Sequence, residues 1–133
     1  MQALKIEETE NSPRVVLDPG GNVFEISGES RPEDVRKFYE PILNWIEEFG
    51  KELASSSEQK QLQFNFVFEY FNSSSAKYIM DIMSKINDIQ VSNSSVDVQI
   101  CWHYEEMDED MLEAGEEFQN ITEIPFKFVV IED

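Results

Sequence analysis

Cysteine and histidine are each present only once in this chain of 133 residues, as Cys101 and His103. A single cysteine excludes an intramolecular disulfide and fits a reducing compartment. A structural zinc site needs about four Cys or His ligands, and the chain has too few of them. We therefore expect a cytoplasmic protein that folds on its hydrophobic core, with no metal and no other cofactor.

Long apolar runs and basic residues are also scarce. No run approaches the roughly 20 apolar residues that cross a bilayer, so no membrane-spanning helix is expected. Only 10 Lys and Arg stand against 28 Asp and Glu, which gives a formal net charge of −18. Such a charge opposes binding to nucleic acid or to an anionic membrane. The expected partners are proteins.

Catalytic motifs are missing as well. The sequence has no Gly-rich phosphate loop, nucleophile elbow or Ser-His-Asp set. Ser74-Ser-Ala-Lys77 matches the Ser-x-x-Lys pattern of penicillin-binding enzymes, but the companion motifs are absent. The acidic cluster over 105–110 lacks the glycine and the spacing of a calcium loop. We predict that the protein is not an enzyme.

Hydrophobic residues make up 41% of the chain and include ten Phe, which predicts one folded domain over residues 1–133. Its periodicity alternates between that of strands and that of helices. The order β-β-α-β-α-β-α-β predicts an α/β sandwich with a mixed sheet. The expected elements are a hairpin over 14–27, a helix after 30–33, a strand over 62–70, a helix over 76–86, a strand over 96–104, a helix over 107–119 and a strand over 125–131.

The first expected helix carries two local signals. Ser30-Arg-Pro-Glu33 has the form of a capping box with proline in the first turn, and it predicts the start of the helix. Pro41 lies inside the apolar pattern that follows. Because proline lacks a backbone donor and clashes with the preceding turn, we expect it to kink or divide this helix.

The centre of the chain changes from strand to helix within a few residues. Apolar side chains alternate with polar ones from Leu62 to Tyr70, which predicts a strand with one apolar face. From Ala76 to Ile86 apolar residues recur at helical spacing. Three serines, 73–75, lie at the join. They are expected to cap the helix, whose first backbone N–H groups attract anions.

Several short motifs resemble the SiaC family of regulatory phosphoproteins in their order and spacing. They are Gly28-Glu-Ser30-x-Pro-Glu33, Tyr39-x-Pro-Ile-x-x-Trp45, Tyr70-Phe-Asn-Ser-Ser-Ser75, Met80-Asp-Ile, Trp102-His-Tyr104, and Glu116-Glu-Phe118 followed by Pro125-Phe126. The resemblance implies a STAS-like fold comparable with that of anti-sigma factor antagonists. Those antagonists usually carry Asp-Ser-Ser-Gly at the junction, where this chain has Asn72 and Ser75 in place of the Asp and the Gly.

The resemblance also implies a protein switch. In such systems a kinase with a histidine-kinase-like ATPase fold phosphorylates the junction hydroxyl, and a PP2C-like phosphatase removes the phosphate. The unphosphorylated form binds and activates a diguanylate cyclase, which promotes cyclic-di-GMP synthesis and biofilm formation. The family's threonine falls on Ser73 here, with Ser74 as the alternative acceptor. The other function class is a STAS-like partner-switching module that binds a different kinase, an anti-sigma factor or a sensor protein.

The surroundings of the junction suggest a partner surface. A phosphoserine at a helix N-terminus is stabilised by the helix dipole, and Lys77 is the nearest candidate cation. Phe71 has the parity opposite to that of the apolar row, so it either borders the partner site or packs on the second sheet face beneath a helix. The residues expected to border the partner site are Phe71, Asn72, Ser74, Ser75 and Lys77.

Overall fold

The computed structural model describes residues 1–132, and its elements follow the predicted order, with one short strand added before it. This strand, β1, was missed because three residues are too few for an alternating pattern to be recognised. The elements are β1 (Leu4–Ile6), β2 (Arg14–Asp18), β3 (Val23–Ser30), α1 (Val35–Ala54), β4 (Lys60–Phe71), α2 (Ser73–Ser92), β5 (Val96–Glu105), α3 (Glu109–Thr122) and β6 (Phe126–Ile131).

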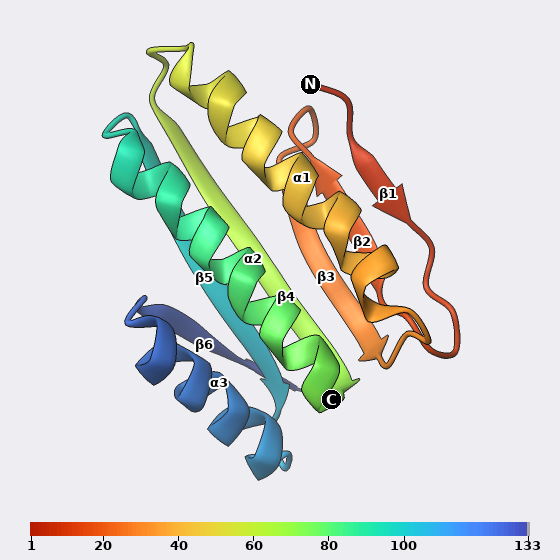
Figure 1. The fold of residues 1–133 in the computed structure, drawn as a ribbon. Helices are drawn as coiled ribbons and strands as arrows, with labels where there is room; N and C mark the ends of the chain where they lie inside the picture. Colours follow the sequence, from red (N-terminus) through yellow and green to blue (C-terminus); the bar gives the residue numbers. More distant parts are fainter. Residues whose placement is uncertain (133) are drawn as a thin grey trace.

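The strands form one mixed sheet in the order β1-β2-β3-β4-β5-β6. The pairs β1/β2 and β2/β3 are antiparallel, whereas the three pairs from β3 to β6 are parallel. Each parallel connection passes through one helix. Because such crossovers are almost always right-handed and all advance in the same direction, the helices fall on one face of the sheet. Figure 1 shows α1, α2 and α3 side by side in front of the strands.

The core lies between this helix layer and the sheet. In β4 the side chains of Leu62, Phe64, Phe66 and Phe68 are at most 5% exposed and belong to the core cluster. The residues between them face the other side of the sheet, which none of the described helices covers, and they are exposed or half-buried. The predicted alternation is therefore confirmed as far as Phe68.

The start of α1 differs from the prediction. Ser30 is the last residue of β3, and the helix is capped instead by Asp34, whose Oδ1 accepts the Lys37 N–H at 3.0 Å. The prediction of a capping box over 30–33 is therefore wrong, because tertiary contacts hold the Ser30 hydroxyl inside the protein. Pro41 lies within one helix and does not divide it. Its ring is on the exposed side, where water can reach the carbonyl that the proline leaves without a donor.

A β-bulge near the end of β4 changes which side chains face the helices. Gly28 of β3 pairs with Phe68, but the next residue, Glu29, pairs with Tyr70, so β4 carries one extra residue. A bulge of this kind reverses the parity of all residues that follow it. The expectation that Tyr70 continues the buried row is therefore wrong, since Tyr70 is 49% exposed.

Phe71 returns to the helix side because of the same bulge. Its ring centroid lies 5.4 Å from that of Phe118 in α3 and 6.2 Å from that of Trp102 in β5. Phe71 thus packs beneath a helix, as one of the two interpretations of the sequence predicted. However, it lies on the same face of the sheet as Phe68 and not on the second face. Its side chain remains half-buried at the end of the sheet.

We predict that Gly115→Ala destabilises the packing of α3 on the sheet. A Cβ atom at Gly115 would lie 2.4 Å from Cδ1 of the buried Trp102 side chain. Such overpacking costs about 1–3 kcal/mol, measurable as a lower urea midpoint. The control is Gly20→Ala in the exposed β2–β3 turn, where the nearest side-chain atom is 3.5 Å from the added Cβ. Equal midpoints for the two variants would contradict this packing.

Candidate functional site

The junction of β4 and α2 is capped by Asn72. This residue has extended backbone angles, and its Oδ1 accepts the Ser75 N–H at 2.9 Å. Its own N–H donates to the Ser30 carbonyl at 3.0 Å, which ties the junction to the end of β3. The expectation that the serines cap the helix is wrong. Asn72 takes that role because it is the last residue with extended backbone angles, and an asparagine caps about as well as a serine.

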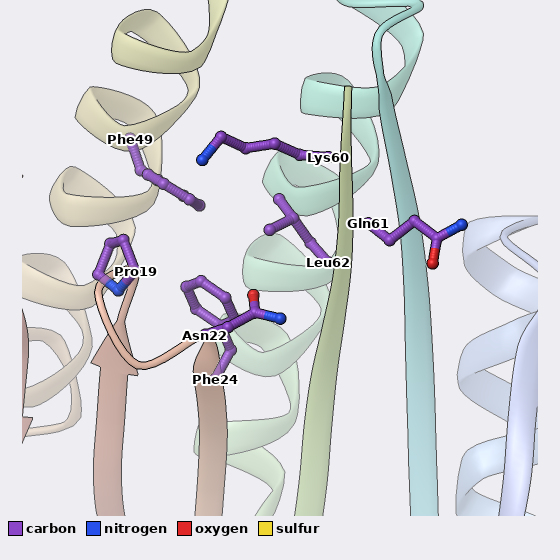
Figure 2. Close-up of a pocket in the computed structure, with 7 residues that line it drawn as sticks. All are labelled: Pro19, Asn22, Phe24, Phe49, Lys60, Gln61 and Leu62. Carbon is purple, nitrogen blue, oxygen red and sulfur yellow. The ribbon is translucent and has the colours of Figure 1, made fainter. Parts of the chain in front are cut away.

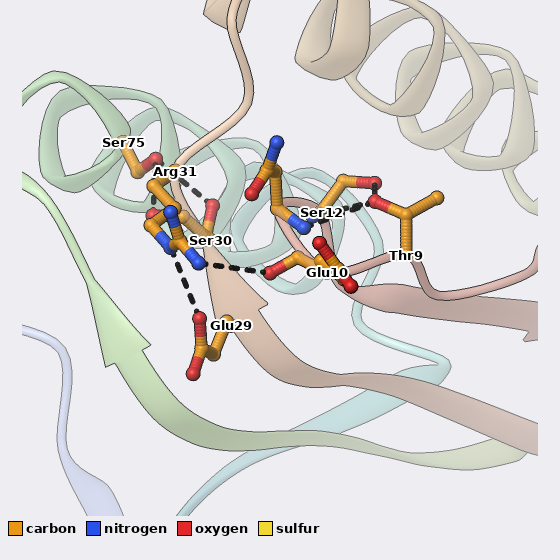
Figure 3. A network of polar contacts seen from close by, with 8 residues as sticks. Thr9, Glu10, Ser12, Glu29, Ser30, Arg31 and Ser75 are labelled. Atoms are coloured by element: carbon orange, nitrogen blue, oxygen red, sulfur yellow. Dashed lines mark hydrogen bonds and ion pairs between the residues drawn. The ribbon is translucent and has the colours of Figure 1, made fainter.

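The three serines occupy the first turn of α2 in different environments. Ser73 and Ser74 are exposed, whereas the Ser75 side chain is fully buried. Ser75 Oγ donates to the Ser30 carbonyl at 3.1 Å and accepts from Ser30 Oγ at 2.9 Å (Figure 3). Ser75 therefore holds the turn from inside and does not present its hydroxyl to a partner, contrary to the expectation for this residue.

A third buried hydroxyl completes this network. Tyr39 of α1 shares a short hydrogen bond with Ser30 Oγ. Because the Ser30 proton is given to Ser75, Tyr39 acts as the donor, and one chain of hydrogen bonds runs from Tyr39 through Ser30 and Ser75 to the Ser30 carbonyl. Burial raises the pKa of Tyr39 to about 12, although the hydrogen bonds to the serines partly oppose this. We call Ser30, Tyr39 and Ser75 the hydroxyl chain.

Sequence patterns gave no sign of the hydroxyl chain. Its members lie 9 and 45 residues apart, and no local spacing connects them. Ser30 and Tyr39 do occur in motifs that resemble the SiaC family, which is the only signal that could have singled them out. Their contacts show why these residues matter: they fix the first turn of α2 against β3 and α1.

Lys77 is the cation closest along the chain to the exposed serines. It is exposed and lies one turn after Ser73 on the same helix, and residues four apart are neighbours on a helix surface. Its Nζ is 6.0 Å from the centroid of the Tyr78 ring. The ring of Tyr78 in turn stacks on that of Tyr39, with centroids 5.7 Å apart. Lys77 is thus placed beside the junction without being buried.

No catalytic constellation accompanies these residues in the described part of the chain. His103 Nε2 is 2.9 Å from Asn65 Oδ1 on the uncovered sheet face, and burial lowers the His103 pKa. Cys101 is buried, and burial raises its pKa, which disfavours a reactive thiolate. Within residues 1–132 there is no group of three His, Cys, Asp or Glu that could hold a metal ion. No helix in the same range is long and apolar enough to cross a membrane.

One hollow lies at the end of the sheet away from the junction (Figure 2). It has a volume of about 260 Å³ and lies beside the start of β4, with Leu62, Phe24 and Phe49 among its lining residues. Lys60 is the one cation in its lining, and its Nζ is 3.8 Å from Glu58 Oε2. Among the described residues that line this hollow there is no Asp, Glu or His beside Lys60, so the junction remains the candidate site.

We predict that Asn72→Ala destabilises the protein by about 0.5–2 kcal/mol, because the variant loses the side-chain cap of α2. Ser74→Ala is the matched control, since the Ser74 side chain is exposed and adjacent to the same turn. Its free energy of unfolding should stay within about 0.5 kcal/mol of the wild type. Urea unfolding measures both values. A larger loss for Ser74→Ala than for Asn72→Ala would contradict the assignment of the cap.

A second prediction concerns alkaline pH. The raised pKa of Tyr39, about 12 against an ordinary value of 10.0, means that the unfolded chain loses this proton first. The free energy of unfolding should therefore be unaffected by this group below about pH 10 and should fall between about pH 10 and 12. Tyr39→Phe should remove that part of the pH dependence. Unfolding curves at about pH 9 and 11 measure it. Identical pH dependence in both proteins would contradict the prediction.

Sequence comparison with known proteins agrees with the family resemblance of the motifs. A model of the family described as SiaC family regulatory phosphoprotein matches residues 6–131. An uncharacterized protein of Pseudomonas aeruginosa is 29% identical over 126 residues, which are 95% of this chain and 94% of that protein.

Solved structures give the same result. The apo-SiaC structure from Pseudomonas aeruginosa is 26% identical, covers 99% of this chain and 100% of its own, and superposes with a TM-score of 0.78. A crystal structure of the diguanylate cyclase SiaD in complex with its activator SiaC, from the same organism, matches at 26% identity, 96% and 99% coverage and a TM-score of 0.82. These matches confirm the predicted fold class. The chain belongs to the SiaC family of regulatory phosphoproteins, and it is therefore a regulator and not an enzyme.

Proposed function

We propose that this protein, in its unphosphorylated form, binds and activates a diguanylate cyclase and so promotes cyclic-di-GMP synthesis in the cytoplasm. The observation that carries the proposal is the exposed Ser73 hydroxyl at the N-terminus of α2, in a chain whose fold matches that of SiaC bound to SiaD. A kinase with an ATPase fold would phosphorylate Ser73, and a PP2C-like phosphatase would reverse the modification.

The environment of Ser73 can hold a phosphate without unfolding the protein. The first N–H groups of a helix lack intrahelical partners, and the helix dipole favours negative charge there. Lys77 adds a cation one turn away. A phosphoserine carries about −1.5 to −2 charges, so few other places on a chain of net charge −18 would stabilise it as well. The buried Ser75 of the hydroxyl chain holds the same turn against β3 through its hydrogen bonds to Ser30.

The phosphate would change the partner surface by its charge and bulk. Ser73, Ser74 and Lys77 are exposed beside the half-buried Phe71 and Asn72, and we propose that these five residues border the cyclase. Burying a phosphate against a partner removes it from water, which costs free energy. Without a matched cation on the partner, the new contacts do not offset this cost. Phosphorylation should therefore weaken cyclase binding sharply.

We predict that Ser73 is the phosphoacceptor. Incubation with the kinase and ATP, followed by peptide mass spectrometry, should find phosphate on Ser73, and Ser73→Ala should abolish it. Ser74→Ala, the matched control, should be phosphorylated as the wild type is. Phosphorylation that persists in Ser73→Ala and disappears in Ser74→Ala would move the acceptor to Ser74.

The cyclase assay tests the switch itself. Unmodified protein and Ser73→Ala should stimulate GTP turnover by a diguanylate cyclase of the same organism up to a fixed molar ratio. The phosphorylated protein should not. Unchanged binding of Lys77→Glu to both kinase and cyclase in titration calorimetry would remove Lys77 from the proposed surface. If neither form activates a cyclase, the alternative of a STAS-like module for a different kinase or sensor takes its place.

A further inference from the structure

The bulge in β4 has a second effect at the junction: it turns an aromatic side chain out of the core. Tyr70 pairs with Glu29 on the uncovered face of the sheet, whereas the next residue, Phe71, packs beneath α3. Tyr70 is 49% exposed and stands three residues before Ser73. Bulges are frequent beside functional sites because they re-aim a side chain, and exposed tyrosines are frequent anchors of protein interfaces.

The same end of the uncovered face is hollowed. One hollow of about 420 Å³ is lined by Val67 and Glu69 of β4 and by Glu105 and Ile131, and Glu69 is the residue before Tyr70 in the sequence. A second hollow, of about 460 Å³, shares Glu105 and Ile131 with it and extends to Met107, a side chain that is 90% exposed. We call these two neighbouring hollows together the open-face hollow. Its lining therefore includes the apolar residues Val67, Phe68, Met107 and Ile131.

Carboxylates surround the open-face hollow. Its linings contain Glu8, Glu69, Glu105, Glu106, Asp108 and Glu132. Among residues 1–132 no lysine or arginine lines it, and no three of the carboxylates converge closely enough for a metal ion. Carboxylates that are spread over a surface suit several cationic side chains of a macromolecule better than one ion. The strongly acidic chain also disfavours nucleic acid and anionic membranes as occupants.

We propose that the open-face hollow, together with the exposed Tyr70 that follows its lining residue Glu69 in β4, is a second docking surface, and that it receives a basic protein segment with an apolar side chain. This inference rests on the proposed function, under which the segment belongs to the diguanylate cyclase. Ser73 lies in α2, which covers the opposite face of the sheet. The hollow is therefore an anchor separate from the phosphate switch, and its contribution to affinity is the same with and without phosphate.

The experiment measures the Kd of the full-length protein for a diguanylate cyclase of the same organism by titration calorimetry. Tyr70→Ser should weaken binding about tenfold or more, as loss of an interface anchor does. Glu105→Lys should weaken it and should also reduce its dependence on salt, because one attractive charge becomes repulsive. Both variants should weaken residual binding of the phosphorylated protein by the same factors. The matched controls are Val91→Ser at the far end of α2, where Val91 is 77% exposed, and Glu117→Lys on α3, and both should bind as the wild type does.

The outcomes distinguish the docking surface, the basic occupant and the proposed function from one another. If the wild type binds the cyclase and Tyr70→Ser binds equally well, the docking surface is wrong and the proposed function stands. Equal or tighter binding of Glu105→Lys overturns the basic occupant. If light scattering shows that the wild type self-associates and that Tyr70→Ser is monomeric, the hollow receives a second copy of the chain instead. If the wild type binds no cyclase, the proposed function fails and this inference fails with it. Unchanged melting temperatures show that the variants are folded.

Discussion

Three crossover connections of the same hand place the three helices of residues 1–132 on one face of the sheet, and the rest of the molecule depends on this arrangement. Because β3, β4, β5 and β6 are parallel and consecutive, each helix also starts at the same edge of the sheet, where its preceding strand ends. Helix N-termini and strand ends therefore meet at one edge, and the junction of β4 and α2 lies at its centre. The same constraint leaves the other face of the sheet without a helix in the part of the chain that the structure describes.

Two local features determine which side chains that edge exposes: the bulge in β4 and the hydroxyl chain. The bulge in β4 reverses the direction of the last side chains, so that Phe71 seals the core beneath α3 and Tyr70 faces solvent. The hydroxyl chain then ties the first turn of α2 to β3 and α1 through buried groups that have hydrogen-bond partners. A buried polar network of this kind stabilises only when it is satisfied, and it fixes one arrangement of the elements. The turn is held by hydrogen bonds on its inner side and presents Ser73 and Ser74 on its outer side.

The charges differ between the two faces of the sheet at this edge. With a net charge of −18, most of the surface repels further negative charge. The N-terminus of α2 is an exception because of the helix dipole and Lys77, whereas the open-face hollow on the other side of the sheet carries only acidic charges in its described lining. The two sides of one edge therefore attract groups of opposite sign. Under the two proposals above, a protein partner that spans this edge carries complementary charges of both signs.

The sequence by itself determined the strand and helix periods, the mixed α/β class and the position of the junction, because side-chain periodicity and composition are local properties. The family resemblance further singled out the serine turn. Only the tertiary structure decided which residue caps α2, which way Tyr70 and Phe71 point, and that Ser75 is buried with Ser30 and Tyr39 while Ser73 is exposed. A single extra residue in β4 and hydrogen bonds between elements 45 residues apart leave no periodic trace, since they depend on strand pairing and helix packing that form only in the folded chain.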